Sequence, residues 1–174
     1  QNKKPVLISD NMIALIHFGR SGTGLLHSLI DNHPEISTLP SIYFSEYYNA
    51  EVWGKLIAQG WDKLPENFIK QFAVLFDARS PVPVPNIEKL RANLGKEEGM
   101  ANVGINRDEV LTVDQNRFCA ELRKLMADYA TLTLQTFFAL VHNAYEKALN
   151  NASNKQTIFY HIHNPSPYAK LNFL

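Results

Sequence analysis

Residues 12–30 read MIALIHFGRSGTGLLHSLI, in which two apolar stretches flank a glycine-rich turn. The first stretch, 12–18, is almost wholly apolar without polar alternation, which is typical of a parallel strand buried on both faces. The second, 23–31, has helical periodicity and ends before Pro34, because proline disfavours helix at the preceding residue. Its expected buried side consists of Leu25, Leu26, Leu29 and Ile30.

The turn itself combines three glycines, one cation and two hydroxyls. In order they are Gly19, Arg20, Ser21, Gly22, Thr23 and Gly24. A helix N-terminus offers free N–H groups and the positive end of the helix dipole, and glycines let the backbone wrap an oxyanion. Arg20 adds a cation with bidentate capacity. The turn therefore predicts a phosphate site, and the alternative is a glycine turn without a ligand. The turn does not match the pattern of a nucleoside-triphosphate loop, because Lys-Ser/Thr does not follow Gly22.

The composition indicates one globular domain. The chain has 174 residues, with 17 basic and 17 acidic side chains, so its formal net charge of zero argues against a broad nucleic-acid interface. The single cysteine, Cys119, allows no internal disulfide, from which we expect a reducing, cytoplasmic location. The sequence has no apolar run of the length needed for a membrane span.

The rest of the chain predicts helices followed by a last strand. A second short strand is expected at 36–39, and helices are expected from Pro65, after Asp114 as an N-cap, and over 131–149. A strand is expected again at 157–160. The predicted fold is α/β, with a parallel β-sheet flanked by helices. Residues 1–174 form one domain in this interpretation, and the mostly helical segment 51–150 is an insertion or lid over an acceptor pocket.

Two residues are candidates for a catalytic base. His163 follows the last predicted strand, at the edge of a parallel sheet where ligands bind, and histidine is suited to accept a proton near neutral pH. Glu46 lies in an aromatic segment, 43–48, whose burial of the carboxyl group would raise its pKa. Either residue has a purely structural alternative, and we favour His163. Three other histidines are interpreted as structural or packing residues: His17, His27 and His142.

The glycine turn resembles the 5′-phosphosulfate loop of sulfotransferases, which use 3′-phosphoadenosine 5′-phosphosulfate (PAPS). The resemblance extends through the leucines of the following helix to His33-Pro34. Gly19 stands where the family usually has proline, and Gly24 where it has a second threonine. The resemblance implies a P-loop NTPase-like sulfotransferase fold and assigns Gly19 to Gly24 to the co-substrate. His163-Asn164-Pro165 resembles the family's histidine-leucine-proline, and a glutamate after the first helix serves as base in several members, as Glu46 would.

The family's arginine for the 3′-phosphate has no counterpart here, so we expect a truncated domain that comprises its N-terminal portion and need not be active alone. The resemblance implies transfer of a sulfuryl group from PAPS to a hydroxyl or amine of a small-molecule, carbohydrate or lipid acceptor, without a metal. Two alternatives remain open. One is a P-loop-type nucleotide or small-molecule kinase, and the other is a non-catalytic interaction domain with a vestigial phosphate loop.

Overall fold

The structure is a computed structural model, and it describes residues 11–17, 21–31, 33–40, 47, 50–80, 105–151 and 155–163, with the side chain of His163 excepted. The sequence also predicts an extended, proline-rich spacer at 81–85 and a loop over 86–107, and the spacer and most of the loop lie outside these residues.

Three parallel strands form the sheet. They are β1 (Asn11–His17), β2 (Ile36–Thr38) and β3 (Thr157–His163). The order is β1-β3-β2, so the strand that comes last in the chain lies between the first two. Its register with β1 runs from Asn11 opposite Thr157 to His17 opposite His163, which brings the carboxyl ends of these two strands to one edge. The predicted parallel α/β arrangement is confirmed. The last strand extends past its predicted end and includes His161.

The helices begin where the sequence supplies caps. The Asp114 carboxylate accepts the N–H of Arg117 at 3.0 Å, and the Thr133 hydroxyl accepts the N–H of Thr136 at 3.1 Å. The predicted cap at Asp114 and the proline in the first turn at Pro65 are both confirmed. The α-helices are α1 (Thr23–Ile30), α2 (Ala50–Ile57), α3 (Leu64–Gln71), α5 (Gln115–Met126) and α6 (Leu134–Ala148). Short 3₁₀ turns are η2 (Trp61–Lys63) and η3 (Ala73–Leu75).

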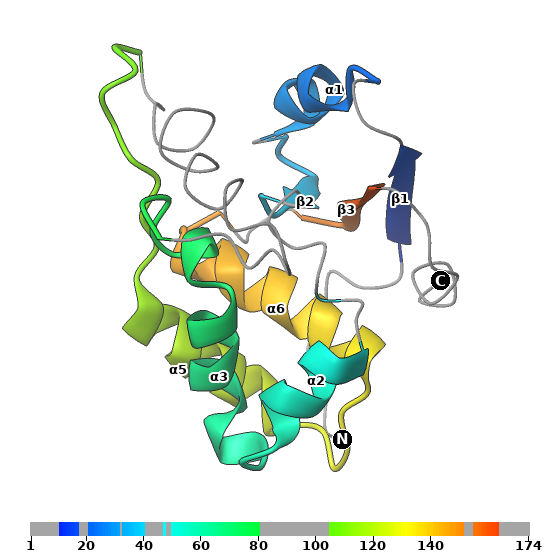
Figure 1. Cartoon of the computed structure of the whole chain (residues 1–174), viewed down its shortest axis with the longest axis vertical. Coiled ribbons are helices and arrows are strands. Elements are labelled where there is room, and N and C mark those ends of the chain that lie inside the picture. Colours follow the sequence, from blue (N-terminus) through cyan, green and yellow to red (C-terminus); the bar gives the residue numbers. More distant parts are fainter. Residues whose placement is uncertain are drawn as a thin grey trace.

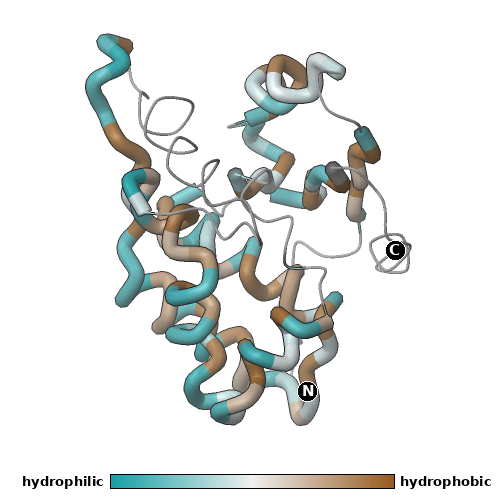
Figure 2. The backbone as a smooth tube through the Cα atoms, in the orientation of Figure 1, coloured by the Kyte–Doolittle hydropathy of each residue, from teal (hydrophilic) through white to brown (hydrophobic). Residues whose placement is uncertain are grey.

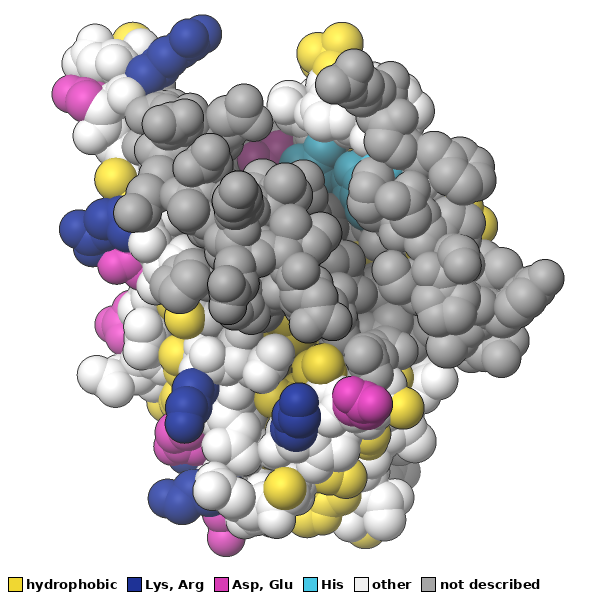
Figure 3. All heavy atoms as spheres, viewed as in Figure 1, with side chains coloured by type: hydrophobic (Ala, Val, Ile, Leu, Met, Phe, Trp, Pro, Cys, Tyr) yellow, Lys and Arg dark blue, Asp and Glu magenta, His cyan; other side chains and the backbone are white. Residues whose placement is uncertain are grey.

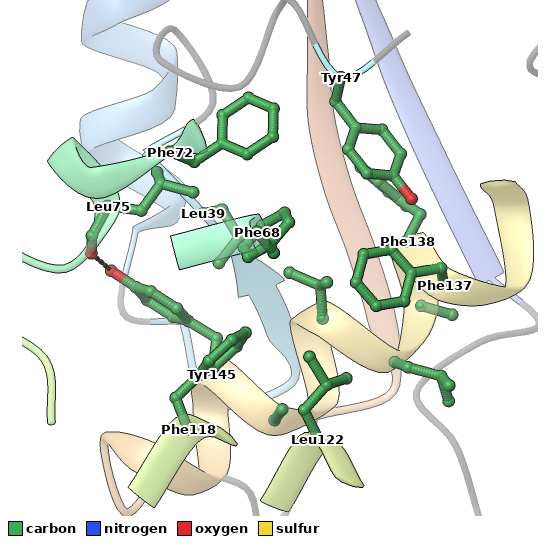
Figure 4. Packing of buried hydrophobic residues seen from close by; sticks show 14 of the residues in the cluster. Leu39, Tyr47, Phe68, Phe72, Leu75, Phe118, Leu122, Phe137, Phe138 and Tyr145 are labelled. Carbon is green, nitrogen blue, oxygen red and sulfur yellow. Dashed lines mark hydrogen bonds between the residues drawn. The ribbon is translucent and has the colours of Figure 1, made fainter. Parts of the chain in front are cut away.

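Helices α2, α3, α5 and α6 form a layer on the face of the sheet opposite α1 (Figure 1). Its core is aromatic, because the ring of Phe68 packs within 6.2 Å of four other phenylalanine rings (Figure 4). The hydroxyl of Tyr145 donates to the carbonyl of Leu75 at 2.6 Å, which satisfies a buried polar group. Each fully buried aromatic side chain contributes about 1.5–3 kcal/mol of hydrophobic free energy. This layer is the main source of stability.

Helices α2, α3, α5 and α6 lie on the other side of the sheet from α1 (Figure 1). The interpretation of 51–150 as an insertion or lid over an acceptor pocket stays a prediction. Tyr47, which belongs to the aromatic segment 43–48, is buried in the core. Its hydroxyl donates to the carbonyl of Leu134 at 2.7 Å.

The two faces of the sheet have different partners. Met12, Ala14 and Tyr160 point toward the helical core, where the ring of Tyr160 packs edge-on against Phe138 at 5.2 Å. Since side chains alternate along a strand, the intervening residues face α1. In Figure 2 the interior of β1 is apolar, and hydrophilic residues lie only at its two ends.

Two sequence predictions about β1 and α1 are wrong. The strand is not covered on both faces, since Ile13 is 51% exposed and no residue of β1 is buried. The expected leucine side of α1 faces outward, with Leu25 69% and Leu29 73% exposed. Of the expected residues only Ile30 is partly buried, and the other partly buried residues of α1 are Thr23 and His27. Their spacing of four and three residues defines one helix face, and this face rather than the leucine face lies on the sheet.

Candidate functional site

Within the glycine turn, Gly22 has a left-handed backbone conformation at the start of α1. Gly22 is the N-cap and has φ of 75° and ψ of 8°, a conformation that favours glycine. Its carbonyl accepts the N–H groups of Leu25 and Leu26 at 3.1 and 3.3 Å. A Cβ atom at Gly22 or Gly24 would meet nothing within 4 Å, so the space around this part of the turn is open.

The N-terminus of α1 is suited to an anion. Among the described residues no side chain caps it, and its first turn carries no acidic residue. The first N–H groups of a helix have no partner within the helix and lie at the positive end of its dipole. The turn follows the carboxyl end of β1, where ligands bind in open parallel sheets. An oxyanion is the class of ligand that such a helix end can bind.

Three histidines from three elements lie beside this turn and form a hydrogen-bonded chain. The Thr23 hydroxyl lies 3.3 Å from His17 Nδ1, and His17 Nε2 lies 3.1 Å from His161 Nδ1. The chain continues from His161 Nε2 to His27 Nδ1 at 2.9 Å. We call Thr23, His17, His161 and His27 the histidine chain. In the space-filling view, histidine side chains (cyan) gather beneath α1 (Figure 3).

The rings of the histidine chain are buried to different extents. His161 is 8% exposed, and its ring packs edge-on against Phe159 at 5.3 Å. Partial burial lowers the pKa of His27, an effect that the nearby Asp31 carboxylate opposes. Within the described residues no group of histidine, cysteine, aspartate and glutamate side chains is arranged to hold a metal ion. The imidazole nitrogens of the histidine chain face one another in pairs instead of converging on one point.

The structure brings some of the predicted site residues together. Ser21, Gly22, Thr23 and Gly24 lie at the start of α1, and the His163 backbone ends β3 opposite His17, at the edge from which this turn departs. The side chain of His163 lies outside the described part of the structure. So do three residues predicted at the site: Gly19, Arg20 and Glu46. Their predicted roles stay predictions.

Sequence reasoning missed the roles of His17, His27 and His161. His17 and His27 were interpreted as structural or packing residues, and the resemblance to sulfotransferases places His161 where that family has a lysine. One signal was available, because His27 follows Thr23 by four residues and so shares its helix face. The proximity of His161 to His17 had no local signal, since 144 positions separate them.

A second polar cluster is buried between β2 and α6. Ser37 Oγ lies 2.8 Å from His142 Nδ1, and burial lowers the pKa of His142 to about 3. Burial also raises the pKa of Glu146, and the Ser37 hydroxyl and the Lys155 ammonium partly offset this rise. The Lys155 ammonium donates to the carbonyls of His33 and Ile36 at 2.7 and 2.8 Å. Ser37 is fully buried, so the cluster joins elements and presents no nucleophile to a substrate.

One cavity lies in the helical layer, away from the turn. It has a volume of about 270 Å³ and lies between η2, the end of α5 and residues 127–132. Its lining includes Trp61, Met126 and Tyr129. None of its lining residues belongs to the turn or to the histidine chain.

No family model, curated protein or solved structure matches this chain. A search of the described helices found none with the length and apolar character needed to cross a membrane.

Proposed function

We propose that this chain binds PAPS at the turn before α1 and takes part in sulfuryl transfer to a hydroxyl or amine. The observation that carries the proposal is the uncapped, open N-terminus of α1, with its left-handed Gly22, at the carboxyl end of a parallel strand. Phosphate groups are the ligands that such helix termini commonly bind.

The proposed chemistry assigns a task to each part of the site. The N–H groups at the start of α1 and the Arg20 guanidinium would bind the phosphosulfate and offset charge on the departing phosphate. A base must remove the acceptor's proton while the sulfur–oxygen bond to the phosphate breaks. His163 is the preferred base and Glu46 the alternative. The acceptor is a small molecule, a carbohydrate or a lipid.

The alternatives differ in what they require of the same turn. A kinase needs a lysine on the terminal phosphates and a hydroxyl on magnesium, and Thr23-Gly24 stands where that pair would be. A non-catalytic interaction domain is favoured by one observation, the outward leucines of α1. Leu25 and Leu29 are available to a protein partner, and a vestigial loop would then need no nucleotide.

Calorimetry separates these possibilities. The chain is titrated with adenosine 3′,5′-bisphosphate, and separately with ATP and magnesium. We expect binding of the bisphosphate and competition by millimolar inorganic sulfate, because both occupy the N-terminus of α1. Preference for ATP with magnesium would indicate a kinase, and absence of binding to either would favour the interaction domain.

A matched pair of variants ties binding to the turn. Gly22→Ala strains the left-handed residue, whereas Gly54→Ala introduces a Cβ into open space within α2. We expect the first variant to weaken bisphosphate binding and the second to leave it unchanged. Equal binding by both folded variants would place the nucleotide elsewhere.

A further inference from the structure

We propose that the histidine chain is a proton relay that conducts a proton between the Thr23 hydroxyl, at the turn, and the His27 imidazole on α1. Its links measure 3.3, 3.1 and 2.9 Å, and they join α1 to β1, β1 to β3, and β3 back to α1. Each link places a donor-capable atom directly opposite an acceptor-capable atom.

The hydrogen-bonding capacity of imidazole restricts the chain to two arrangements. A neutral ring has one N–H donor and one acceptor nitrogen. In the first arrangement Thr23 donates to His17, His17 donates to His161, and His161 donates to His27. In the second arrangement every donor and acceptor is exchanged. A mixed arrangement would place two hydrogens or two lone pairs in one link, so the tautomer of one ring determines the tautomers of the others.

Passage of one proton converts the first arrangement into the second. A proton binds Thr23 Oγ1 as the hydroxyl gives its own proton to His17 Nδ1. His17 Nε2 then gives its proton to His161 Nδ1, and His161 Nε2 gives its proton to His27 Nδ1. His27 Nε2 releases a proton to solvent. One O–H or N–H bond forms for each that breaks, all groups end neutral, and no further reactant is needed.

The surroundings favour conduction through the rings. His161 is nearly inaccessible to water, whereas Thr23, His17 and His27 are partly exposed, so the ring of His161 is the member of the chain that is shielded from solvent. Among the described side chains, the titratable groups that face the chain are its own rings from β1, β3 and α1, together with Asp31 at the end of α1. The backbone of His163 is the register partner of His17.

The relay deepens the proposed function, and only the origin of its proton rests on that function. Sulfuryl transfer releases the proton of the acceptor hydroxyl or amine beside the turn. A relay that begins at Thr23 would carry this proton to His27, one turn further along the same face of α1, where it passes to solvent.

Nuclear magnetic resonance of the full chain, labelled with ¹⁵N at histidine, tests the relay directly. Correlations between ring protons and nitrogens report which nitrogen carries hydrogen in each ring as the pH changes, with a chelator present to remove metal ions. We expect His17, His161 and His27 to titrate at one shared midpoint. Three separate midpoints in the unsubstituted chain, with those of His17 and His27 unchanged in His161→Gln, would overturn the relay, because glutamine can form hydrogen bonds but cannot exchange protons as imidazole does.

A second set of variants keeps the test independent of that buried substitution. Thr23→Val removes the hydroxyl at nearly constant shape, and we expect it to change the tautomer of His17 and, through it, that of His161. Thr23→Ser should restore the original tautomers, and His33→Gln, outside the chain, should leave them unchanged. A change confined to His17 would overturn the relay.

The relay and the proposed function fail separately. Shared titration in a chain that binds no adenosine 3′,5′-bisphosphate would support the relay and contradict sulfuryl transfer. Independent titration in a chain that binds the bisphosphate would overturn the relay and leave the proposed function standing.

Discussion

The helical layer and the layer formed by α1 with β1 bury their apolar residues very differently. In the helical layer Phe68, Phe72, Phe118 and Phe137 are wholly buried, whereas α1 has no buried residue and exposes Leu25 and Leu29. Histidines rather than leucines make the contact between α1 and the sheet. Stability therefore comes mainly from one layer, and the other layer carries the turn and the titratable groups on which function is proposed to depend.

The largest expected effect comes from breaking the aromatic core. Phe68→Ala should lower the free energy of unfolding by about 3–5 kcal/mol, because it removes a wholly buried ring and leaves a cavity. Leu29→Ala, on the exposed side of α1, should change it by less than about 0.5 kcal/mol. Urea unfolding of both variants measures the contrast. A comparable loss in Leu29→Ala would mean that α1 is covered in solution.

The next largest expected effect is on the pH dependence of the free energy of unfolding. It arises from His142, in the buried cluster between β2 and α6. The pKa of His142 is lowered to about 3 in the folded chain, so below about pH 6.5 the unfolded chain binds a proton that the folded chain does not. Stability should fall with decreasing pH by about 1.4 kcal/mol per pH unit from this group.

The control for this prediction is His142→Gln, measured by urea unfolding at several pH values. The difference between the two pH profiles isolates His142 from Glu146, whose raised pKa acts in the opposite direction as the pH falls. Parallel profiles would contradict the prediction.

Arg20→Ala should weaken nucleotide binding without lowering the stability of the helical core. If Arg20 binds the phosphosulfate, its removal should weaken nucleotide binding by about 1.5–3 kcal/mol, the scale of a charge-assisted hydrogen bond. The melting temperature of the unliganded variant should stay nearly constant. Calorimetry and thermal unfolding measure the two quantities, and an unchanged affinity in a folded variant removes Arg20 from the site.

The smallest expected effect is the change in stability caused by substituting Gly22 in the turn. Gly22→Ala should cost about 1–2 kcal/mol of stability, because the residue is left-handed. Gly54→Ala, in the interior of α2 with open space around it, should stabilise the chain by about 0.4–1 kcal/mol. Thermal unfolding compares the pair. A neutral Gly22→Ala would show that the turn relaxes at no cost, and with it the argument for a preformed anion site would fail.

Local features of the sequence were sufficient for most elements of the fold. Apolar runs predicted β1 and β3, the proline and the aromatic spacing predicted α3, and Asp114 predicted the start of α5, because each depends on residues close together in the chain. The turn before α1 was predicted for the same reason, since the three glycines and the following helix are contiguous. Ser21 to Gly24 accordingly lie where the sequence placed them.

Only the tertiary structure decided which face of α1 meets the sheet and which histidines meet one another. The leucine and histidine faces of α1 both have helical spacing, and the sheet selects the one that pairs His27 with His161. His161 reaches His17 only because β3 lies beside β1 in a fixed register. Strand order and register depend on packing across the whole chain, and no local pattern encodes them. The sequence by itself determined the elements and the turn, and the assembly of the sheet determined the histidine chain.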